Sequence, residues 1–236
     1  MRNQIFSVLF GLTATVVVSA PLRVQAETKL YQFGSGYESL RFDPAGLEAL
    51  KSIGLSLNSV ESTAVPAAGY DYAFNYVPSP TGNDFVFSYD DVTKEFTPIR
   101  GTVDFSGSTF FDVDTTKLNL TSPLELGNLF AEPAANSNVV DTITTKLPIF
   151  NLVPTAPARV DLEKGTTTLN FAALIAPEFS DYLIAAGASK SIAGVKLGDI
   201  QGDRNITPIP EPASALAILM AASTALAVGK RRRISA

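Results

Sequence analysis

Three acidic segments carry the side chains of this chain that could do chemistry. They are Asp90 with Asp91, Asp112 with Asp114, and residues 198–205. Two carboxylates flanking a glycosidic bond can hydrolyse a polysaccharide, and carboxylate oxygens are also the ligands that calcium prefers. None of the segments has the spacing of a calcium-binding loop, and Arg204 would lie among the ligands of the third. Because aspartate is common in surface turns, turn formation is the simpler interpretation, and we predict no metal site.

The composition excludes several other kinds of site. The 236 residues include no histidine, no cysteine and no tryptophan. Nucleophiles activated by histidine, thiolate metal sites and histidine-bound zinc or haem are therefore excluded. Gly34, Ser35 and Gly36 do not continue into a phosphate-binding loop. The sequence thus predicts no catalytic residue and no cofactor.

Aromatic residues alternate with smaller ones on either side of a turn-rich segment, residues 78–84. Tyr70, Tyr72, Phe74 and Tyr76 precede it, and Phe85, Phe87 and Tyr89 follow it. Alternation puts each set on one face of a strand, so we predict a hairpin over residues 70–89 with Tyr72, Phe74, Phe85 and Phe87 buried. A surface that stacks on carbohydrate, using Tyr70, Tyr72 and Tyr76, is the functional alternative.

The N-terminus has the three parts of a secretory signal peptide. Arg2 provides the positive charge, residues 5–20 are apolar, and Val24 and Ala26 place small side chains before a cleavage point. We predict that signal peptidase cleaves after Ala26, with Ala20 as the alternative. The rest of the chain is therefore expected to be exported.

The C-terminus has a second tripartite pattern. Pro210, Glu211 and Pro212 precede an apolar run, residues 213–228. A helix over this run would rise about 24 Å, slightly short of a hydrocarbon core of roughly 30 Å, and Gly229 with a snorkelling Lys230 can make up the difference. The cluster Lys230, Arg231, Arg232 and Arg233 follows it. Cations are costly to translocate, so these residues should stay in the cytoplasm while everything before Pro210 lies outside the inner membrane.

Residues 208–236 resemble the PEP-CTERM sorting signal in all three parts. The resemblance implies a Gram-negative bacterium or a cyanobacterium, and processing by an exosortase-like membrane transpeptidase that recognises Pro210, Glu211 and Pro212. It also implies an association with exopolysaccharide and biofilm. An ordinary single-pass anchor is the alternative.

The body between the two signals is acidic. Residues 27–209 contain 22 acidic and 12 basic residues, a net charge of −10, compared with −5 for the whole chain. This charge argues against nucleic acid as a partner. Divalent cations could still bridge the body to an anionic matrix.

Short alternating strands separated by Gly, Pro, Asn and Asp dominate the body, which predicts a mainly β, antiparallel sandwich-like domain. Besides the hairpin, strands are expected over residues 95–105, 109–114, 117–121, 139–147, 159–162 and 166–171. Two helices interrupt them. Asp43, Pro44 and Gly54 delimit the first, and Pro177 and Gly187 delimit the second.

The expected organisation is a signal peptide over residues 1–26, a β-rich domain over 27–202, a linker over 203–209 and the sorting signal over 210–236. The favoured function is a non-catalytic surface or extracellular-matrix protein. The alternatives are a carbohydrate-binding module and a secreted polysaccharide hydrolase that uses two of the four aspartates Asp90, Asp91, Asp112 and Asp114.

Overall fold

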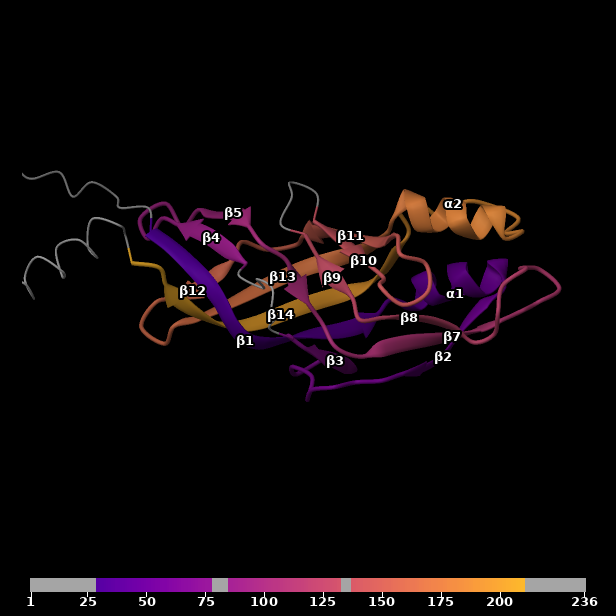
Figure 1. Ribbon diagram of the computed structural model, residues 1–236, viewed down its shortest axis with the longest axis horizontal. Helices are drawn as coiled ribbons and strands as arrows, with labels where there is room; N and C mark the ends of the chain where they lie inside the picture. Colours follow the sequence, from indigo (N-terminus) through magenta and orange to yellow (C-terminus); the bar gives the residue numbers. More distant parts are fainter. Residues whose placement is uncertain (1–28, 78–84, 133–136, 211–236) are drawn as a thin grey trace, which may run out of the picture.

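The computed structural model describes residues 29–77, 85–132 and 137–210, and this part of the chain is mainly antiparallel β-structure with two helices (Figure 1). The predicted β class is therefore confirmed. Within these residues, eleven strands form one curled sheet and three form a second. The elements are β1 (Lys29–Phe42), α1 (Pro44–Ile53), β2 (Leu55–Val60), β3 (Tyr72–Asn75), β4 (Val86–Tyr89), β5 (Phe96–Arg100), β6 (Val103–Asp104), β7 (Ser108–Val113), β8 (Leu124–Gly127), β9 (Phe130–Ala131), β10 (Asn138–Val140), β11 (Pro148–Pro154), β12 (Arg159–Asp161), β13 (Thr166–Ile175), α2 (Pro177–Ala185) and β14 (Lys196–Pro208).

The large sheet curls until its strands surround a common interior. Its order is β5, β4, β1, β14, β13, β11, β10, β9, β6, with β3 paired to β1 and β12 paired to β13. Just beyond β3 and β6, Tyr76 and Phe105 form an antiparallel bridge, and the Val77 N–H donates to the Asp104 carbonyl over 2.8 Å. This bridge joins β3 to β6, so the path β1, β14, β13, β11, β10, β9, β6, β3 closes into a ring.

The first and last described strands lie side by side at the centre of this sheet. β1 pairs antiparallel with β14 from Tyr31 opposite Pro208 to Phe42 opposite Gly198, with an irregularity between Phe33 and Gly36. Both ends of the described chain therefore leave the molecule at the same end, far from the two helices (Figure 1).

The predicted helices are confirmed. Asp43 caps α1, because its side chain accepts a hydrogen bond from the Ala45 N–H over 2.9 Å, and Gly54 ends the helix at φ 106°. α1 packs on β2 and β14, and α2 packs on β11. The smaller sheet, in the order β2, β7, β8, lies near α1 (Figure 1).

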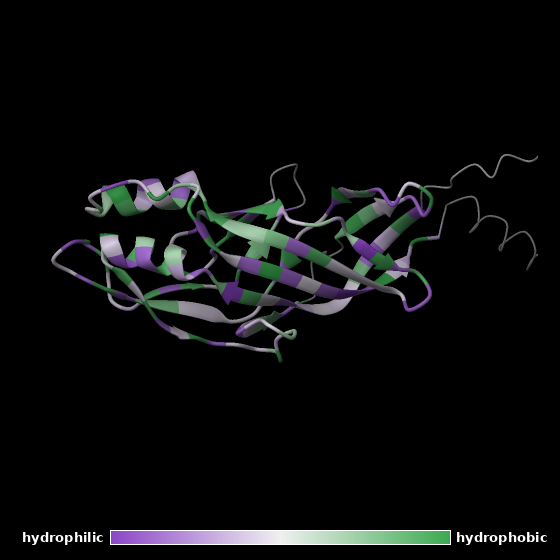
Figure 2. Cartoon of the chain, turned by 180° about the vertical axis from the view of Figure 1, so that it is seen from behind, coloured by the Kyte–Doolittle hydropathy of each residue, from purple (hydrophilic) through white to green (hydrophobic). Residues whose placement is uncertain are grey.

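Alternation along the long strands separates an inner face from an outer one. On β13, Thr167, Leu169, Ala173 and Ile175 are buried, whereas the residues between them are more exposed. Figure 2 shows the same alternation as bands of hydrophobic and hydrophilic residues along the strands of the large sheet. The inward-facing set is mostly apolar and lines the interior of the ring.

The prediction that residues 70–89 form an aromatic hairpin is wrong. Most of the aromatic side chains that were predicted to be buried are nevertheless buried. β3 and β4 do not pair with each other; both pair with β1, β3 along Tyr37–Leu40 and β4 along Lys29–Gln32. Phe74, Phe85 and Phe87 are buried as predicted, and Tyr72 is half-buried. A strand from earlier in the chain thus replaces the local pairing.

The predicted linker is also wrong where the structure describes it. Residues 203–208 belong to β14, which is hydrogen-bonded to β1 on one side and β13 on the other. The polar sequence of this segment is compatible with a central strand because its inward positions are Gly202, Arg204 and Ile206, all buried.

Most of the other predicted strands are present, with different bounds. Three predicted strands correspond to single observed ones: 109–114 to β7, 159–162 to β12, and 166–171 to the first part of β13. Residues 95–105 form two strands, β5 and β6. Of residues 139–147 only the start is a strand, β10. Residues 117–121 form none. The Lys117 and Leu118 N–H groups both donate back to the Asp114 carbonyl, at 2.9 and 3.0 Å, and this makes a turn.

The two sorting signals lie almost wholly outside the described residues. Pro210 is described and exposed. The other residues singled out in the two signals lie outside the described part of the chain: Val24, Ala26, Glu211, Pro212, Lys230, Arg231, Arg232 and Arg233. Within residues 29–77, 85–132 and 137–210, no helix is both long and apolar enough to cross a membrane.

Candidate functional site: an apolar cavity with a buried ion pair

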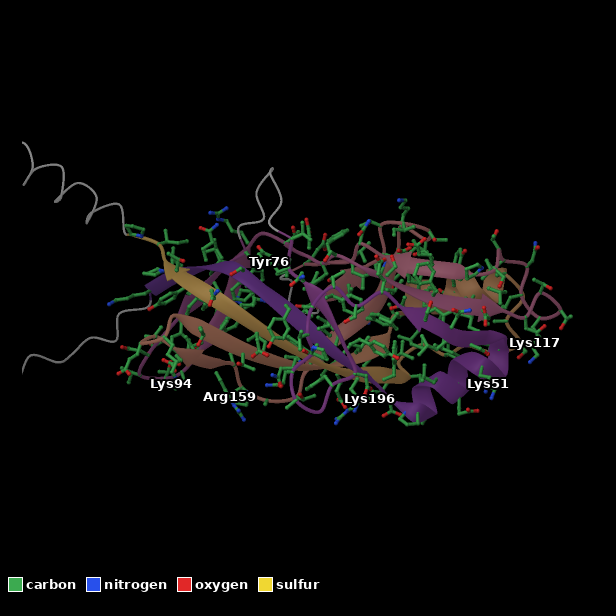
Figure 3. All side chains as sticks on the ribbon, turned by 90° about the horizontal axis from the view of Figure 1, so that it is seen from below. Lys51, Tyr76, Lys94, Lys117, Arg159 and Lys196 are labelled. Atoms are coloured by element: carbon green, nitrogen blue, oxygen red, sulfur yellow. The ribbon has the colours of Figure 1, made fainter. Side chains whose placement is uncertain are left out.

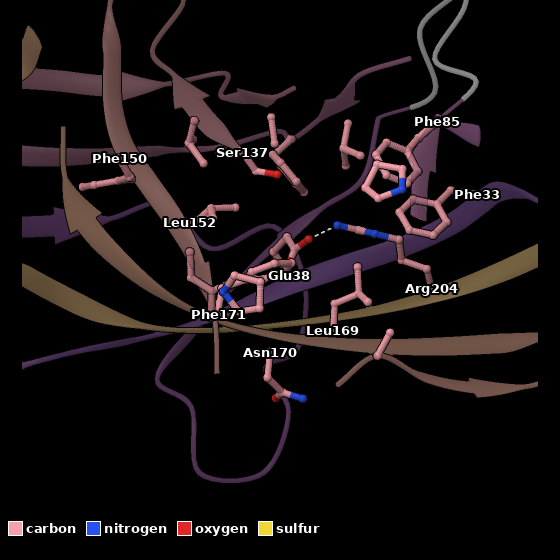
Figure 4. A pocket seen from close by; sticks show the side chains of 18 of the residues that line it. Phe33, Glu38, Phe85, Ser137, Phe150, Leu152, Leu169, Asn170, Phe171 and Arg204 are labelled. Carbon is pink, nitrogen blue, oxygen red and sulfur yellow. Dashed lines mark ion pairs between the residues drawn. The ribbon is translucent and has the colours of Figure 1, made fainter. Parts of the chain in front are cut away.

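A cavity of about 450 Å³ lies inside the ring of strands. This volume falls within the range of about 300–1,000 Å³ that is usual for small-molecule sites. The lining is mostly aromatic and aliphatic and comes from β1, β3, β5, β6, β9, β10, β11, β13 and β14 and the loops beside them (Figure 4). The aromatic members are Phe33, Phe74, Phe85, Phe96, Phe105, Phe150 and Phe171.

The cavity opens to solvent between β5 and the loop that follows β11. Among its lining residues Lys94, Pro98, Glu132, Pro154 and Pro157 are exposed, whereas Phe33, Phe74, Phe85, Val103, Phe105 and Arg204 are buried. The exposed group thus marks the rim and the buried group the floor.

Two cations lie close to the rim. Lys94 lines the cavity itself, and it shares a second, adjoining depression with Arg159. Figure 3 shows both at one end of the molecule, away from Lys51 and Lys117. Glu132 lies on the same rim and Asp161 lines the same depression, so the opening carries charges of both signs.

An ion pair between Glu38 of β1 and Arg204 of β14 lies in the floor. Arg204 Nη2 contacts Glu38 Oε1, and the side chains are only 2% and 13% exposed for Arg204 and Glu38 respectively. Figure 4 shows the two groups pointing toward each other between Phe33 and Phe171. Two charges are therefore removed from water inside an otherwise apolar cavity.

Glycines on the same two strands make room for this pair. Gly202 lies directly opposite Glu38, and a Cβ there would come within 2.6 Å of Glu38 Oε2. Gly36 lies opposite Arg204, and a Cβ there would lie 2.3 Å from the Asp203 carbonyl oxygen and 2.9 Å from Arg204 Cα. The close approach of β1 and β14 at the pair thus depends on Gly36, whereas Gly202 leaves room for the Glu38 carboxylate.

Three aromatic rings surround the guanidinium of Arg204. Its central carbon lies 5.0 Å from the ring centre of Phe33, 5.5 Å from that of Phe105 and 5.7 Å from that of Tyr76. Such contacts attract a cation, most strongly where water is excluded. Burial lowers the pKa of Arg204 to about 9, because desolvation penalises the charged form, so the group stays cationic at neutral pH.

Several polar atoms at this pair have no hydrogen-bond partner among the described residues. They are Glu38 Oε2, Arg204 Nε, Arg204 Nη1 and Thr167 Oγ1. Thr167 belongs to the cluster because it lies opposite Arg204 on the neighbouring strand β13. Buried polar groups in proteins are nearly always hydrogen-bonded, and Glu38 and Arg204 line the cavity, so their three atoms leave hydrogen-bonding capacity for a polar group there.

The aspartates considered as a catalytic pair are spread over local structures and do not line the cavity. Asp90 accepts from the Val92 and Thr93 N–H groups at 2.8 and 2.9 Å, and these backbone hydrogen bonds, chiefly that from Thr93, lower its pKa. Asp114 accepts from Thr116, which lowers the pKa of Asp114, and Asp112 accepts from the Asn58 amide. Asp91 is exposed in the same turn as Asp90. Turn formation accounts for Asp90 and Asp114.

The three tyrosines considered for carbohydrate stacking do not form one exposed surface. Tyr76 is 6% exposed and faces Arg204 in the interior. Tyr72 packs edge-on against Phe42, and Tyr70 lies under the Arg41 guanidinium. Both are half-buried.

Sequence reasoning missed Glu38 as a site residue and assigned Arg204 only to a loop. One signal was available. Ile200, Gly202, Arg204 and Ile206 repeat at every second position, so a strand over them would place an arginine on its apolar face. Its acidic partner lies at the other end of the chain, and no local spacing indicates it.

The comparisons with known proteins give distant structural similarities, of which two are described here. No protein-family profile and no curated protein matches the sequence. Among solved structures, the fold is similar to the C-terminal domain of HtaA from Corynebacterium glutamicum, with a TM-score of 0.44 and 15% identity over 75% of this chain and 99% of that one. It is also similar to the heme binding protein HtaB from Corynebacterium glutamicum, with a TM-score of 0.39 and 12% identity over 77% of this chain and 97% of that one.

Proposed function

We propose that this is an exported binding protein that holds one small, largely apolar molecule inside the ring of strands. The observation that carries the proposal is the cavity of about 450 Å³, with its phenylalanine-rich wall and its opening at Lys94 and Pro98. Cavities lined by apolar groups, with a few polar groups placed among them, are the usual form of small-molecule sites. Non-covalent binding is the activity that such a wall supports.

The carbohydrate and hydrolase alternatives have less support. A sugar presents many hydroxyl groups, and each needs a hydrogen-bond partner when it leaves water. The cavity wall offers few polar groups, and none of Asp90, Asp91, Asp112 and Asp114 lines it. The association with exopolysaccharide stays a prediction that follows from the tail alone.

Filling the cavity tests the proposal. The Leu152→Trp variant adds a large ring on an inward position of β11, and we expect it to reduce binding of the neutral apolar dye N-phenyl-1-naphthylamine at least tenfold. Val153 is the next residue on the same strand, is 45% exposed, and provides the matched control Val153→Trp. Dye fluorescence measures binding, and circular dichroism checks that both variants are folded.

The two variants separate the possible outcomes. Loss of binding in Leu152→Trp alone supports the cavity as the site. Equal binding by both variants, or no binding of the dye to the wild-type protein, would contradict the proposal.

We also propose that the C-terminal tail is a sorting signal processed by an exosortase-like enzyme. The support is the order of Pro210, Glu211 and Pro212, the apolar run and the basic cluster, together with the exposed position of Pro210 at the end of β14. Replacing the three residues with alanine should leave export intact, because neither signal peptide nor apolar run changes. Processing should fail, and the uncleaved tail should persist in the membrane fraction.

Mass spectrometry of the mature C-terminus checks this prediction. Neutral replacements of Lys230 and Arg231 to Arg233 serve as the contrast, because they weaken the stop-transfer charge and should disturb orientation instead. If the alanine variant keeps the wild-type mature mass and location, the tail is a plain membrane anchor.

A further inference from the structure

We propose that the molecule held in the cavity is an apolar carboxylic acid, whose head group binds between Arg204 and Glu38. The inference rests on the proposed function, since it names the class of ligand for the same cavity. It is carried by the unpartnered polar atoms of the ion pair, which are buried in the floor of an apolar chamber.

Arg204 defines what the ligand must accept. Its guanidinium can only donate hydrogen bonds, and one of its nitrogens, Nη2, pairs with Glu38. Nε and Nη1 have no partner within the described chain, although the side chain is 2% exposed. A ligand that meets this demand brings an oxygen acceptor to the guanidinium.

Glu38 defines what the ligand must donate. An ionised carboxylate only accepts, and Glu38 Oε2 has no donor in the part of the chain that the structure describes. A carboxylic acid has both groups in one head: its carbonyl oxygen accepts from Arg204, and its O–H donates to Glu38. If the ligand were ionised, its carboxylate and that of Glu38 would face a single guanidinium, and the three groups together would carry a net negative charge. The acid therefore binds in its protonated form, with its proton retained or taken up from water.

The surroundings fit the rest of such a molecule. Beyond the pair, Phe150, Leu152 and Phe171 provide an apolar wall for a hydrocarbon chain (Figure 4).

A purely structural ion pair is the competing explanation. Buried pairs also occur where they only join two strands, and Arg204 and Glu38 do join β14 to β1. With such a pair, the affinity of the cavity for an apolar ligand would not depend on the ligand's head group. The two explanations therefore differ in ligand preference, which can be measured in the wild-type protein.

The experiment compares dodecanoic acid with its methyl ester, its primary amide and dodecanol, each displacing N-phenyl-1-naphthylamine from the wild-type protein. The four share one hydrocarbon chain and differ in the head group. We expect the acid to bind at least about tenfold more tightly than the ester, which cannot donate and therefore leaves Glu38 Oε2 unsatisfied. The amide presents an acceptor and a donor as the acid does, so its affinity shows whether the acidic O–H is preferred over an N–H. Equal affinities for acid and ester, or tighter binding of the amide, would overturn the assignment.

A double variant and its matched control extend the test. Glu38→Leu with Arg204→Met removes both charges together and should bind the dye while losing the preference for the acid. Arg41 and Asp199 form an ion pair at 3.0 Å between the same two strands, with Arg41 exposed. Arg41→Met with Asp199→Leu should keep the preference.

The dye separates failure of this inference from failure of the proposed function. If the dye binds and the acid preference is absent, or survives in the Glu38 and Arg204 double variant, only the head-group site is wrong. If neither the dye nor any of the four ligands binds the wild-type protein, the cavity is not a binding site.

Discussion

The Arg204→Met variant is expected to lose about 3–5 kcal/mol of unfolding free energy, because removing one partner leaves the other charge buried and unpaired. Glu38 has a side chain only 13% exposed, inside a wall of aromatic rings. The variant also loses the contacts of the guanidinium with Phe33, Phe105 and Tyr76. Guanidinium chloride unfolding, followed by circular dichroism, measures the change.

The double variant Glu38→Leu with Arg204→Met should recover much of that loss. Well-packed apolar residues of similar volume often replace a buried ion pair at little cost. Arg41→Met is the control for an exposed pair between the same strands, and its effect should be much smaller. Equal destabilisation by Arg204→Met and Arg41→Met would mean that the interior pair is well solvated.

The second large effect is expected at Asp141, which is fully buried at the end of β10. Its carboxylate accepts from the Gly127 N–H at 2.9 Å, the Ile143 N–H at 3.1 Å and the Thr144 N–H at 3.0 Å. Asp141→Ala leaves these donors without their acceptor and separates β8 from the turn after β10. We expect a loss of at least about 3 kcal/mol in unfolding free energy.

Asp90 provides the control for Asp141. It accepts from the Val92 and Thr93 N–H groups in the same way, but in an exposed turn where water can replace it. Asp90→Ala should therefore lower the denaturation midpoint far less than Asp141→Ala. Similar midpoints for the two variants would show that burial at Asp141 adds nothing to its hydrogen bonds.

The sequence predicts the elements whose signals are local. Asp43, Pro44 and Gly54 act through hydrogen bonds and backbone angles within a few residues, so α1 begins and ends where expected. β7 and β12 were found for a similar reason, since alternation is visible within one strand. These features need no knowledge of the partner strands.

Pairing across the chain could not be predicted in this way. The turn-rich residues 78–84 favour a hairpin, but β3 and β4 each pair with β1, which is long enough to pair with both along different parts of its length. The polar residues before Pro208 are typical of a linker, yet they complete the sheet because β1 and β13 flank them. The site shares this difficulty, since Glu38 and Arg204 meet only through the β1–β14 register.

The central position of β1 and β14 also constrains the order in which the molecule can form. β1 is synthesised first among the described strands, and the strand that covers its longest edge is synthesised last. A chain emerging from a ribosome or a translocation channel therefore exposes the backbone donors and acceptors on the edge of β1 that pairs with β14 until nearly the whole domain is available. Such long-range closure is slow, and an unpaired edge can associate with other chains. Assembly of the ring thus has to wait for release of the C-terminal strand.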